Sequence, residues 1–100
     1  MDYTNVKDGN INRIEMKGKF TFSDHGEFKK LFDSFKDKAM SQVEFNMKNV
    51  EFVDSAALGL LLLARDEAEK SGKKLVIVGP EGQVKKMFEI SRFYELFDVR

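Results

Sequence analysis

The sequence predicts an α/β protein whose sheet contains parallel strands. Segments in which apolar and polar residues alternate, as in strands, are followed by segments with the period of a helix. The order strand, helix, strand, helix requires crossover connections, and these join parallel strands. Residues 75–78 form a continuous apolar run, which favours a strand buried on both faces.

Length and composition indicate a single domain that spans residues 1–100. A chain of 100 residues can bury one hydrophobic core but not two. An apolar share of 42% with 10 Phe indicates an aromatic-rich core rather than disorder. The 17 basic residues are balanced by 17 acidic ones and form no basic stripe, so we expect no nucleic-acid partner.

The residue content excludes several kinds of chemistry. The chain has no Cys and a single His, His25, so thiol nucleophiles, disulfides and Cys or His-pair metal sites cannot form. We therefore expect neither a metal nor a cofactor. Residues 1–10 lack the apolar segment of a signal peptide, and residues 60–64, the longest apolar run, are too short to cross a bilayer. We expect a cytoplasmic protein without a membrane partner.

The first half of the chain predicts a hairpin or bent strand, a helix and a second strand. Gly9-Asn10 is a turn signal among residues that alternate as in a strand: Ile11, Ile14, Met16, Phe20 and Phe22. Ser23 is suited to cap a helix whose apolar face holds Phe28, Leu31, Phe32, Phe35 and Ala39. The next strand is indicated by Val43, Phe45 and Met47, which alternate with polar residues.

The second half predicts a long helix, the buried strand and a helical C-terminal part. The long helix starts near Ser55 and runs to Lys70, and Gly72 is the left-handed residue that would end it. After the strand at residues 75–78, a last helix carries Val84, Met87 and Phe88. The tail is expected to form a final helical turn that closes the core with Phe93, Leu96, Phe97 and Val99.

The long helix has an apolar stripe and a second, mixed side. At about 100° per residue the stripe that faces the sheet contains Ala57, Leu60, Leu61, Ala64 and Ala68. Leu58 and Leu62 point away from it, on the side of Arg65, Asp66 and Glu69. Either this side is a partner surface or neighbouring elements bury its leucines. Gly59 costs about 1 kcal/mol relative to Ala, which indicates close approach by a partner or another helix.

Ser55 has two interpretations. At a strand-to-helix junction its hydroxyl can cap the helix by accepting a hydrogen bond from a first-turn amide. It can also be a phosphorylation site, because the helix amides would tolerate an added charge of about −1.5 to −2. Asp54 and Glu51 would then concentrate negative charge at one end of the Leu58 and Leu62 surface. A partner that binds this surface would be repelled.

A serine hydrolase is the enzyme alternative, and the pattern opposes it. Ser55 lacks the flanking glycines of a G-x-S-x-G turn, and His25 is the single available imidazole base. Neither glycine-rich phosphate-binding motif, G-x-x-x-x-G-K-[ST] or G-x-G-x-x-G, occurs. We therefore expect a protein-binding regulator rather than an enzyme.

Residues 49–59, Asn-Val-Glu-Phe-Val-Asp-Ser-Ala-Ala-Leu-Gly, resemble the signature of STAS-domain anti-sigma factor antagonists. The resemblance extends through Gly72, residues 75–79 and Phe97 and covers nearly the whole chain. Asn46 and Ala57 depart from the usual Asp and Gly of the family. The resemblance implies a STAS-like single domain with a mixed sheet of four to five strands and about four helices packed mainly on one face.

The resemblance also implies a phosphorylation-controlled partner switch. An anti-sigma factor that is also a serine kinase would phosphorylate Ser55, and a metal-dependent serine/threonine phosphatase would reverse the reaction. The unmodified form would bind the anti-sigma factor, and the phosphorylated form would release it. The expected partner-binding residues are Asp54, Ser55, Ala56, Leu58, Gly59, Leu62, Arg65 and Glu69. The alternative is a constitutive scaffold or accessory subunit of a transporter or signalling assembly, in which Ser55 only caps the helix.

Overall fold

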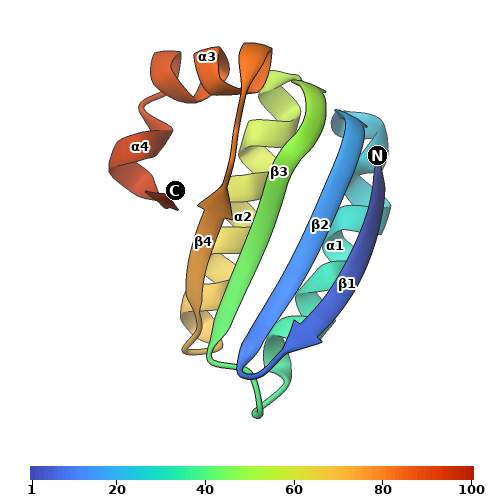
Figure 1. The fold of residues 1–100 in the computed structure, drawn as a ribbon, viewed down its shortest axis with the longest axis vertical. Helices are drawn as coiled ribbons and strands as arrows, with labels where there is room; N and C mark the ends of the chain where they lie inside the picture. Colours follow the sequence, from blue (N-terminus) through green and yellow to red (C-terminus); the bar gives the residue numbers. More distant parts are fainter.

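A computed structural model describes residues 1–100 and contains one five-stranded mixed sheet, drawn in Figure 1. The strand order is β1-β2-β3-β4-β5. β1 is antiparallel to β2, and the other neighbouring strands are parallel. The strands are β1 (Asp2–Asp8), β2 (Ile11–Phe20), β3 (Gln42–Val53), β4 (Lys74–Val78) and β5 (Asp98–Val99). The predicted α/β class and mixed sheet are confirmed.

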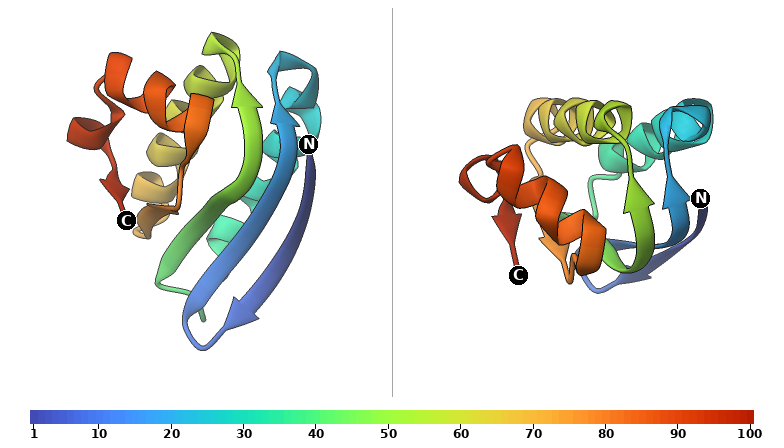
Figure 2. Two further views of the ribbon diagram at one scale, coloured as in Figure 1. Left: turned by 45° about the horizontal axis from the view of Figure 1, so that its top comes forward. Right: turned by 90° about the horizontal axis from the view of Figure 1, so that it is seen from above.

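Four α-helices and two 3₁₀ segments accompany the sheet. They are η1 (Phe22–Asp24), α1 (His25–Lys30), η2 (Leu31–Lys36), α2 (Ser55–Lys70), α3 (Gly82–Ile90) and α4 (Phe93–Leu96). The views in Figure 2 place α1 and α2 on one face of the sheet. In Figure 1, α3 lies over the end at which β3 and β4 finish, and α4 lies beside β4.

The N-terminal hairpin confirms the predicted turn at Gly9-Asn10. Asp8 pairs with Ile11, and the two residues between them form the turn. Gly9 has a φ of 60°, in the left-handed region where glycine has no steric penalty. Phe22, predicted as a strand residue, instead opens η1 and is 60% exposed.

The segment after β2 differs from the predicted single helix. It is divided into η1, α1 and η2, and Ser23 lies inside η1 rather than capping a helix. The turn is held instead by Asp24, whose carboxylate accepts a hydrogen bond of 2.9 Å from the amide of Thr21. Ala39 lies outside the helical segment and is exposed. A spacing of three residues between apolar positions suits 3₁₀ turns as well as an α-helix, and Phe28 and Leu31 are buried as expected.

β3 is longer than the sequence pattern indicated. It continues through Phe52 to Val53 and so carries the chain directly to the start of α2. Its inward side chains belong to a core cluster of 22 buried residues, which also includes residues of α1, α2 and α3. In β4 the consecutive residues Val76 and Ile77 are both fully buried, which confirms a strand covered on both faces.

The C-terminal end of α2 and the tail complete the fold. Gly72 has a φ of 69°, its amide donates to Glu69, and the Lys73 amide donates to Ala68. These two bonds are the Schellman arrangement that ends helices, so the predicted stop is confirmed. The predicted helical turn near Phe93 is present as α4. Val99 was expected in that turn, but it pairs with Ile77 in β5 instead.

Candidate functional site

The N-cap of α2 is Asp54, and the prediction that Ser55 occupies this position is wrong. Asp54 has extended backbone, and its Oδ1 accepts a hydrogen bond of 2.7 Å from the amide of Ala57. Its Oδ2 accepts a second bond of 3.1 Å from the amide of Phe22 in η1. Asp and Ser are both good cap residues. The long-range bond to Phe22 favours the carboxylate in this position.

Ser55 is the first residue of α2, and its side chain is free. The residue is exposed, and its hydroxyl forms no hydrogen bond within the chain. The fold therefore does not use the hydroxyl, and capping does not explain the serine. The oxygen is open to solvent at the positive end of the helix dipole, where added negative charge is favourable.

Val53, which precedes the cap, is fixed by a side chain from α3. The amide of Val53 donates to Oε1 of Gln83, and the carbonyl of Val53 accepts from Nε2, each at 3.0 Å. The Gln83 amide group thus replaces a strand partner for the last residue of β3. No pattern in the sequence indicates this contact, because a glutamine at a helix start is usually solvated.

The exposed face of α2 runs down the helix from Ser55. Gly59 and Asp66 are exposed on this face, and Leu62 is half-buried between them. Ala56 is half-buried beside Ser55. No atom of another part of the chain lies within 4 Å of the place that a side-chain Cβ of Gly59 would take. The expectation that another helix approaches Gly59 is therefore wrong for this chain.

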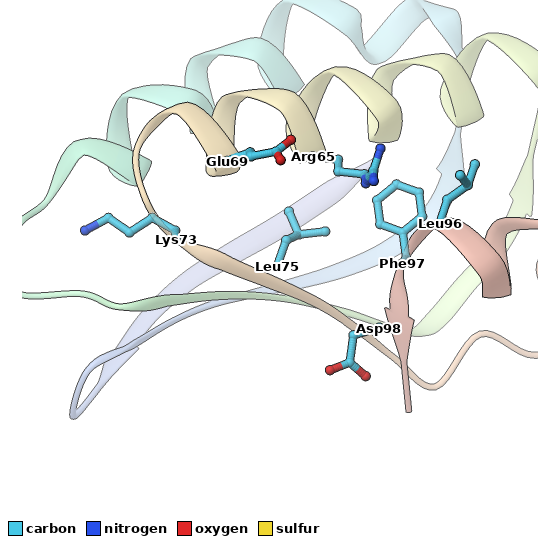
Figure 3. A pocket seen from close by; sticks show the side chains of 7 residues that line it. All are labelled: Arg65, Glu69, Lys73, Leu75, Leu96, Phe97 and Asp98. Carbon is cyan, nitrogen blue, oxygen red and sulfur yellow. The ribbon is translucent and has the colours of Figure 1, made fainter.

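The predicted exposure of Leu58 is also wrong. Leu58 is 6% exposed and belongs to the same core cluster as Phe93 and Phe97 of the C-terminal segment. Phe97 also lines a cavity beside Arg65 and Glu69, so the C-terminal segment lies along part of α2 (Figure 3). On the opposite flank Leu63 is 44% exposed, although the sequence pattern did not single it out. The exposed large apolar residues of η1, the end of β3 and the first half of α2 are therefore Phe22, Phe52 and Leu63.

Arg65 and Glu69 lie at the other end of α2, beside a small cavity. The rise of a helix places Glu69 about 21 Å along the axis from Ser55. The cavity has a volume of about 160 Å³, and Figure 3 shows its lining. It is formed by Arg65, Glu69, Lys73, Leu75, Leu96, Phe97 and Asp98.

Two of the charged residues around this cavity are already paired. Lys73 extends away from it and donates to the backbone carbonyls of Asp37 and Met40. The Arg100 guanidinium, 3.1 Å from Asp98, lowers the pKa of the Asp98 carboxyl. The predicted site residues thus form two groups, one around Ser55 and one at this cavity.

An aromatic pair stands next to the Ser55 group. The rings of Phe22 and His25 stack with centroids 4.7 Å apart, and Nδ1 of His25 lies 2.9 Å from the carbonyl oxygen of Phe22. This contact therefore engages the Nδ1 atom of the imidazole within the turn. No group of three or more His, Cys, Asp or Glu residues gathers to hold a metal, and no helix is long and apolar enough to span a membrane.

These features define an α/β domain with an exposed serine where a central parallel strand meets a helix. The model of the STAS domain family matches residues 4–100, and the chain therefore belongs to the STAS domain family. A STAS-domain containing protein of Pseudomonas aeruginosa (strain UCBPP-PA14) is 31% identical over 94 residues, which cover 92% of this chain and 90% of that protein. The resemblance inferred from residues 49–59 is confirmed at the level of the family.

Solved structures of the same fold include regulators and a transporter-related protein. An anti-sigma factor antagonist from Mycobacterium paratuberculosis superposes with a TM-score of 0.84 at 10% identity, over 98% of this chain and 83% of that one. The antagonist SpoIIAA in its unphosphorylated form gives 0.73 at 16% identity, over 99% and 87%. A sulfate transporter family protein from Wolinella succinogenes gives 0.80 at 20% identity, over 94% and 79%.

Proposed function

We propose that this chain is a phosphorylation-controlled partner-switching regulator of the anti-sigma factor antagonist type, with Ser55 as the phosphate acceptor. The observation that carries the proposal is the separation of roles between Asp54 and Ser55. Asp54 caps α2, so the exposed hydroxyl of Ser55 has no structural role. The similarity in fold to SpoIIAA, for which a phosphorylated and an unphosphorylated structure exist, supports the same interpretation.

The modification transfers the γ-phosphoryl group of ATP to Oγ of Ser55. An O–P bond forms, the bond between the β- and γ-phosphates breaks, ADP leaves, and the hydroxyl proton passes to a base of the kinase. The product adds a charge of about −1.5 to −2 at the start of α2. A metal-dependent serine/threonine phosphatase restores the hydroxyl when water cleaves the O–P bond. The chain itself supplies the acceptor and no catalytic group.

The partner surface lies on the exposed face of α2 around Ser55. The residues that the structure leaves accessible there are Asp54, Ser55, Ala56, Gly59 and Leu62, with Arg65 and Glu69 further along. Leu58 is removed from this surface because it is buried. The unmodified surface binds an anti-sigma factor that is also a serine kinase, in the cytoplasm, and the phosphorylated surface releases it.

Phosphate mapping tests the proposal. Wild-type protein, Ser55→Ala and the matched control Ser23→Ala are incubated with the candidate anti-sigma factor kinase and ATP, and their intact masses are compared. Wild type and Ser23→Ala should each gain one phosphoryl group, and Ser55→Ala should gain none. Equal uptake by all three proteins would remove Ser55 as the acceptor.

A constitutive scaffold is the second candidate function. The fold similarity to a sulfate transporter family protein supports it, because that protein is related to a transporter rather than a sigma-factor regulator. In this role the partner remains bound whatever the state of Ser55. A complex isolated from cells that survives both phosphatase treatment and the Ser55→Glu substitution would favour the scaffold over the switch.

A further inference from the structure

Gly59 lies inside α2 at a place where the fold does not require glycine. Its φ is not in the left-handed region, unlike that of Gly72, so the backbone would accept any side chain. No atom of another element lies within 4 Å of the position of a Cβ, so no neighbouring element needs the space. Glycine in a helix interior lowers stability relative to alanine. A site with this cost and no internal reason for it points to a contact outside the chain.

Gly59 is also placed on the exposed face that begins at Ser55. Four residues along a helix bring it to about 40° from Ser55 and one turn further along the axis. Leu62 and Asp66 continue the same face, and Leu63 flanks it. The missing side chain therefore leaves helix backbone exposed between the serine and an apolar patch formed by Leu62 and Leu63.

We propose that Gly59 is the point where the main chain of the protein partner packs directly against α2, which deepens the proposed function and rests on it. The rest of the face defines the chemistry of this partner segment. Leu62 and Leu63 require an apolar side chain. Asp66 and Glu69 form no ion pair, whereas Glu67 is paired with Lys70 at 3.9 Å, so they attract basic side chains. The occupant is a partner segment with an apolar residue followed by Lys or Arg.

This placement gives phosphorylation a second way to act. A partner backbone in contact with Gly59 passes within one helical turn of the Ser55 oxygen. The phosphoryl group would fill part of the volume that this backbone needs, so it would exclude the partner by size as well as by charge. A small neutral side chain at position 59 should have the same type of effect without any charge.

The test compares Gly59→Ala with Gly26→Ala. Gly26 is a matched control, since it is also an exposed helical glycine with nothing within 4 Å of its Cβ position, and it lies in α1. Both substitutions should raise the melting temperature, by about 4 °C if the full helical preference for alanine is realised. The probe for binding is the purified candidate anti-sigma factor kinase, titrated by calorimetry without ATP.

We expect Gly59→Ala to weaken binding at least about tenfold, equivalent to about 1.4 kcal/mol, while Gly26→Ala binds as wild type does. Equal affinity of both variants, or a lower melting temperature for Gly59→Ala, would overturn the proposal. The proposed function is judged separately by phosphate on Ser55. If the kinase binds wild type but does not phosphorylate it, the switch is contradicted, and the affinities of the two glycine variants still test the role of Gly59. If the kinase binds neither wild type nor the two variants, both the switch and the Gly59 contact are overturned.

Discussion

The carboxylate of Asp54 binds the backbone amide of Phe22, 32 residues earlier in the chain, at 3.1 Å. The same carboxylate caps α2 through Ala57. One side chain therefore ties η1 to the junction between β3 and α2. The bond holds the backbone of Phe22 beside Asp54, which precedes Ser55, while the exposed Phe22 ring stacks on His25.

Replacing Asp54 should destabilise the fold more than replacing Ser55. We expect Asp54→Ala to lower the free energy of unfolding by about 1 to 2 kcal/mol, because the cap and the Phe22 bond are both lost. Asp54→Asn should lower the free energy of unfolding by less, since its side-chain oxygen can still accept the hydrogen bond from the Ala57 amide. Ser55→Ala should stay within about 0.5 kcal/mol of wild type. Urea denaturation measures all three, and an equal loss in Ser55→Ala and Asp54→Ala would restore Ser55 as the cap.

Gln83 should contribute more to the free energy of unfolding than its position on a helix surface suggests. Gln83→Ala leaves both main-chain groups of the buried residue Val53 without a partner. We expect a loss of about 1 to 3 kcal/mol in the free energy of unfolding. Faster hydrogen exchange of the Val53 amide would accompany it. Lys86→Ala, an exposed change on the same helix, is the control and should have little effect; similar losses in both variants would contradict a specific role for Gln83.

Alanine should have opposite effects at two glycines of the α2 segment. Gly72 has a φ of 69°, a conformation that costs a residue with a Cβ about 1 to 2 kcal/mol. Gly72→Ala should therefore lower the free energy of unfolding, whereas Gly59→Ala should raise it. Thermal and urea unfolding of the two variants in parallel provide the measurement. A stabilising Gly72→Ala would show that the Schellman end of α2 is not formed as described.

Acid titration should detect the contact between β1 and the segment before β3. The Lys7 ammonium, 2.5 Å from Asp37, and the Ala39 amide hold the pKa of the Asp37 carboxyl below its ordinary value of about 3.9. A lowered folded pKa stabilises the fold above pH about 4, and this contribution is lost as pH falls through the folded value. NMR titration should show the pKa of Asp37 rising toward its ordinary value in Lys7→Ala. Lys17→Ala should leave it unchanged, and no difference between the two variants would exclude the ion pair.

Charge and size can be separated at Ser55 with a pair of similar shape. Ser55→Asp and Ser55→Asn add nearly the same volume, but only Asp adds a charge. We expect both substitutions to weaken binding of the candidate anti-sigma factor kinase, and Ser55→Asp should have the lower affinity because it adds charge as well as size. Calorimetry at low and high salt measures the effect, since raised salt should reduce the difference between them. Wild-type affinity in both substituted proteins and in genuinely phosphorylated protein would reject the switch.

Much of the fold follows from local patterns in the sequence. α2 begins and ends where the apolar period and Gly72 place it, and the hairpin turn falls at Gly9-Asn10. These features depend on residues close together in the chain. The family signature around Ser55 likewise lies in one short segment, so it was readable without a structure.

The wrong predictions about the cap of α2 and the exposure of its leucines have a common physical origin, which is contact between segments distant in the chain. Asp54 and Ser55 are adjacent residues with similar capping ability, and the bond that favours Asp54 comes from Phe22. Leu58 is buried in the core cluster and Leu63 is exposed, although both lie off the stripe of α2 that faces the sheet. A helical wheel describes one helix alone and contains no information about its neighbours. The partner role of the remaining face stays a prediction.

Asp54 caps α2, whereas Ser55 is the phosphate acceptor of the proposed switch, so stability and the proposed regulation depend on different residues. A phosphoryl group on Ser55 breaks no hydrogen bond of the fold, because the serine hydroxyl forms none. The modification would then leave the cap of α2 by Asp54 in place, and no refolding would delay the response. Phosphorylation of Ser55 would then change only the surface that the partner contacts. The rate of such a response would be set by the modifying enzymes and by the partner, and not by this chain.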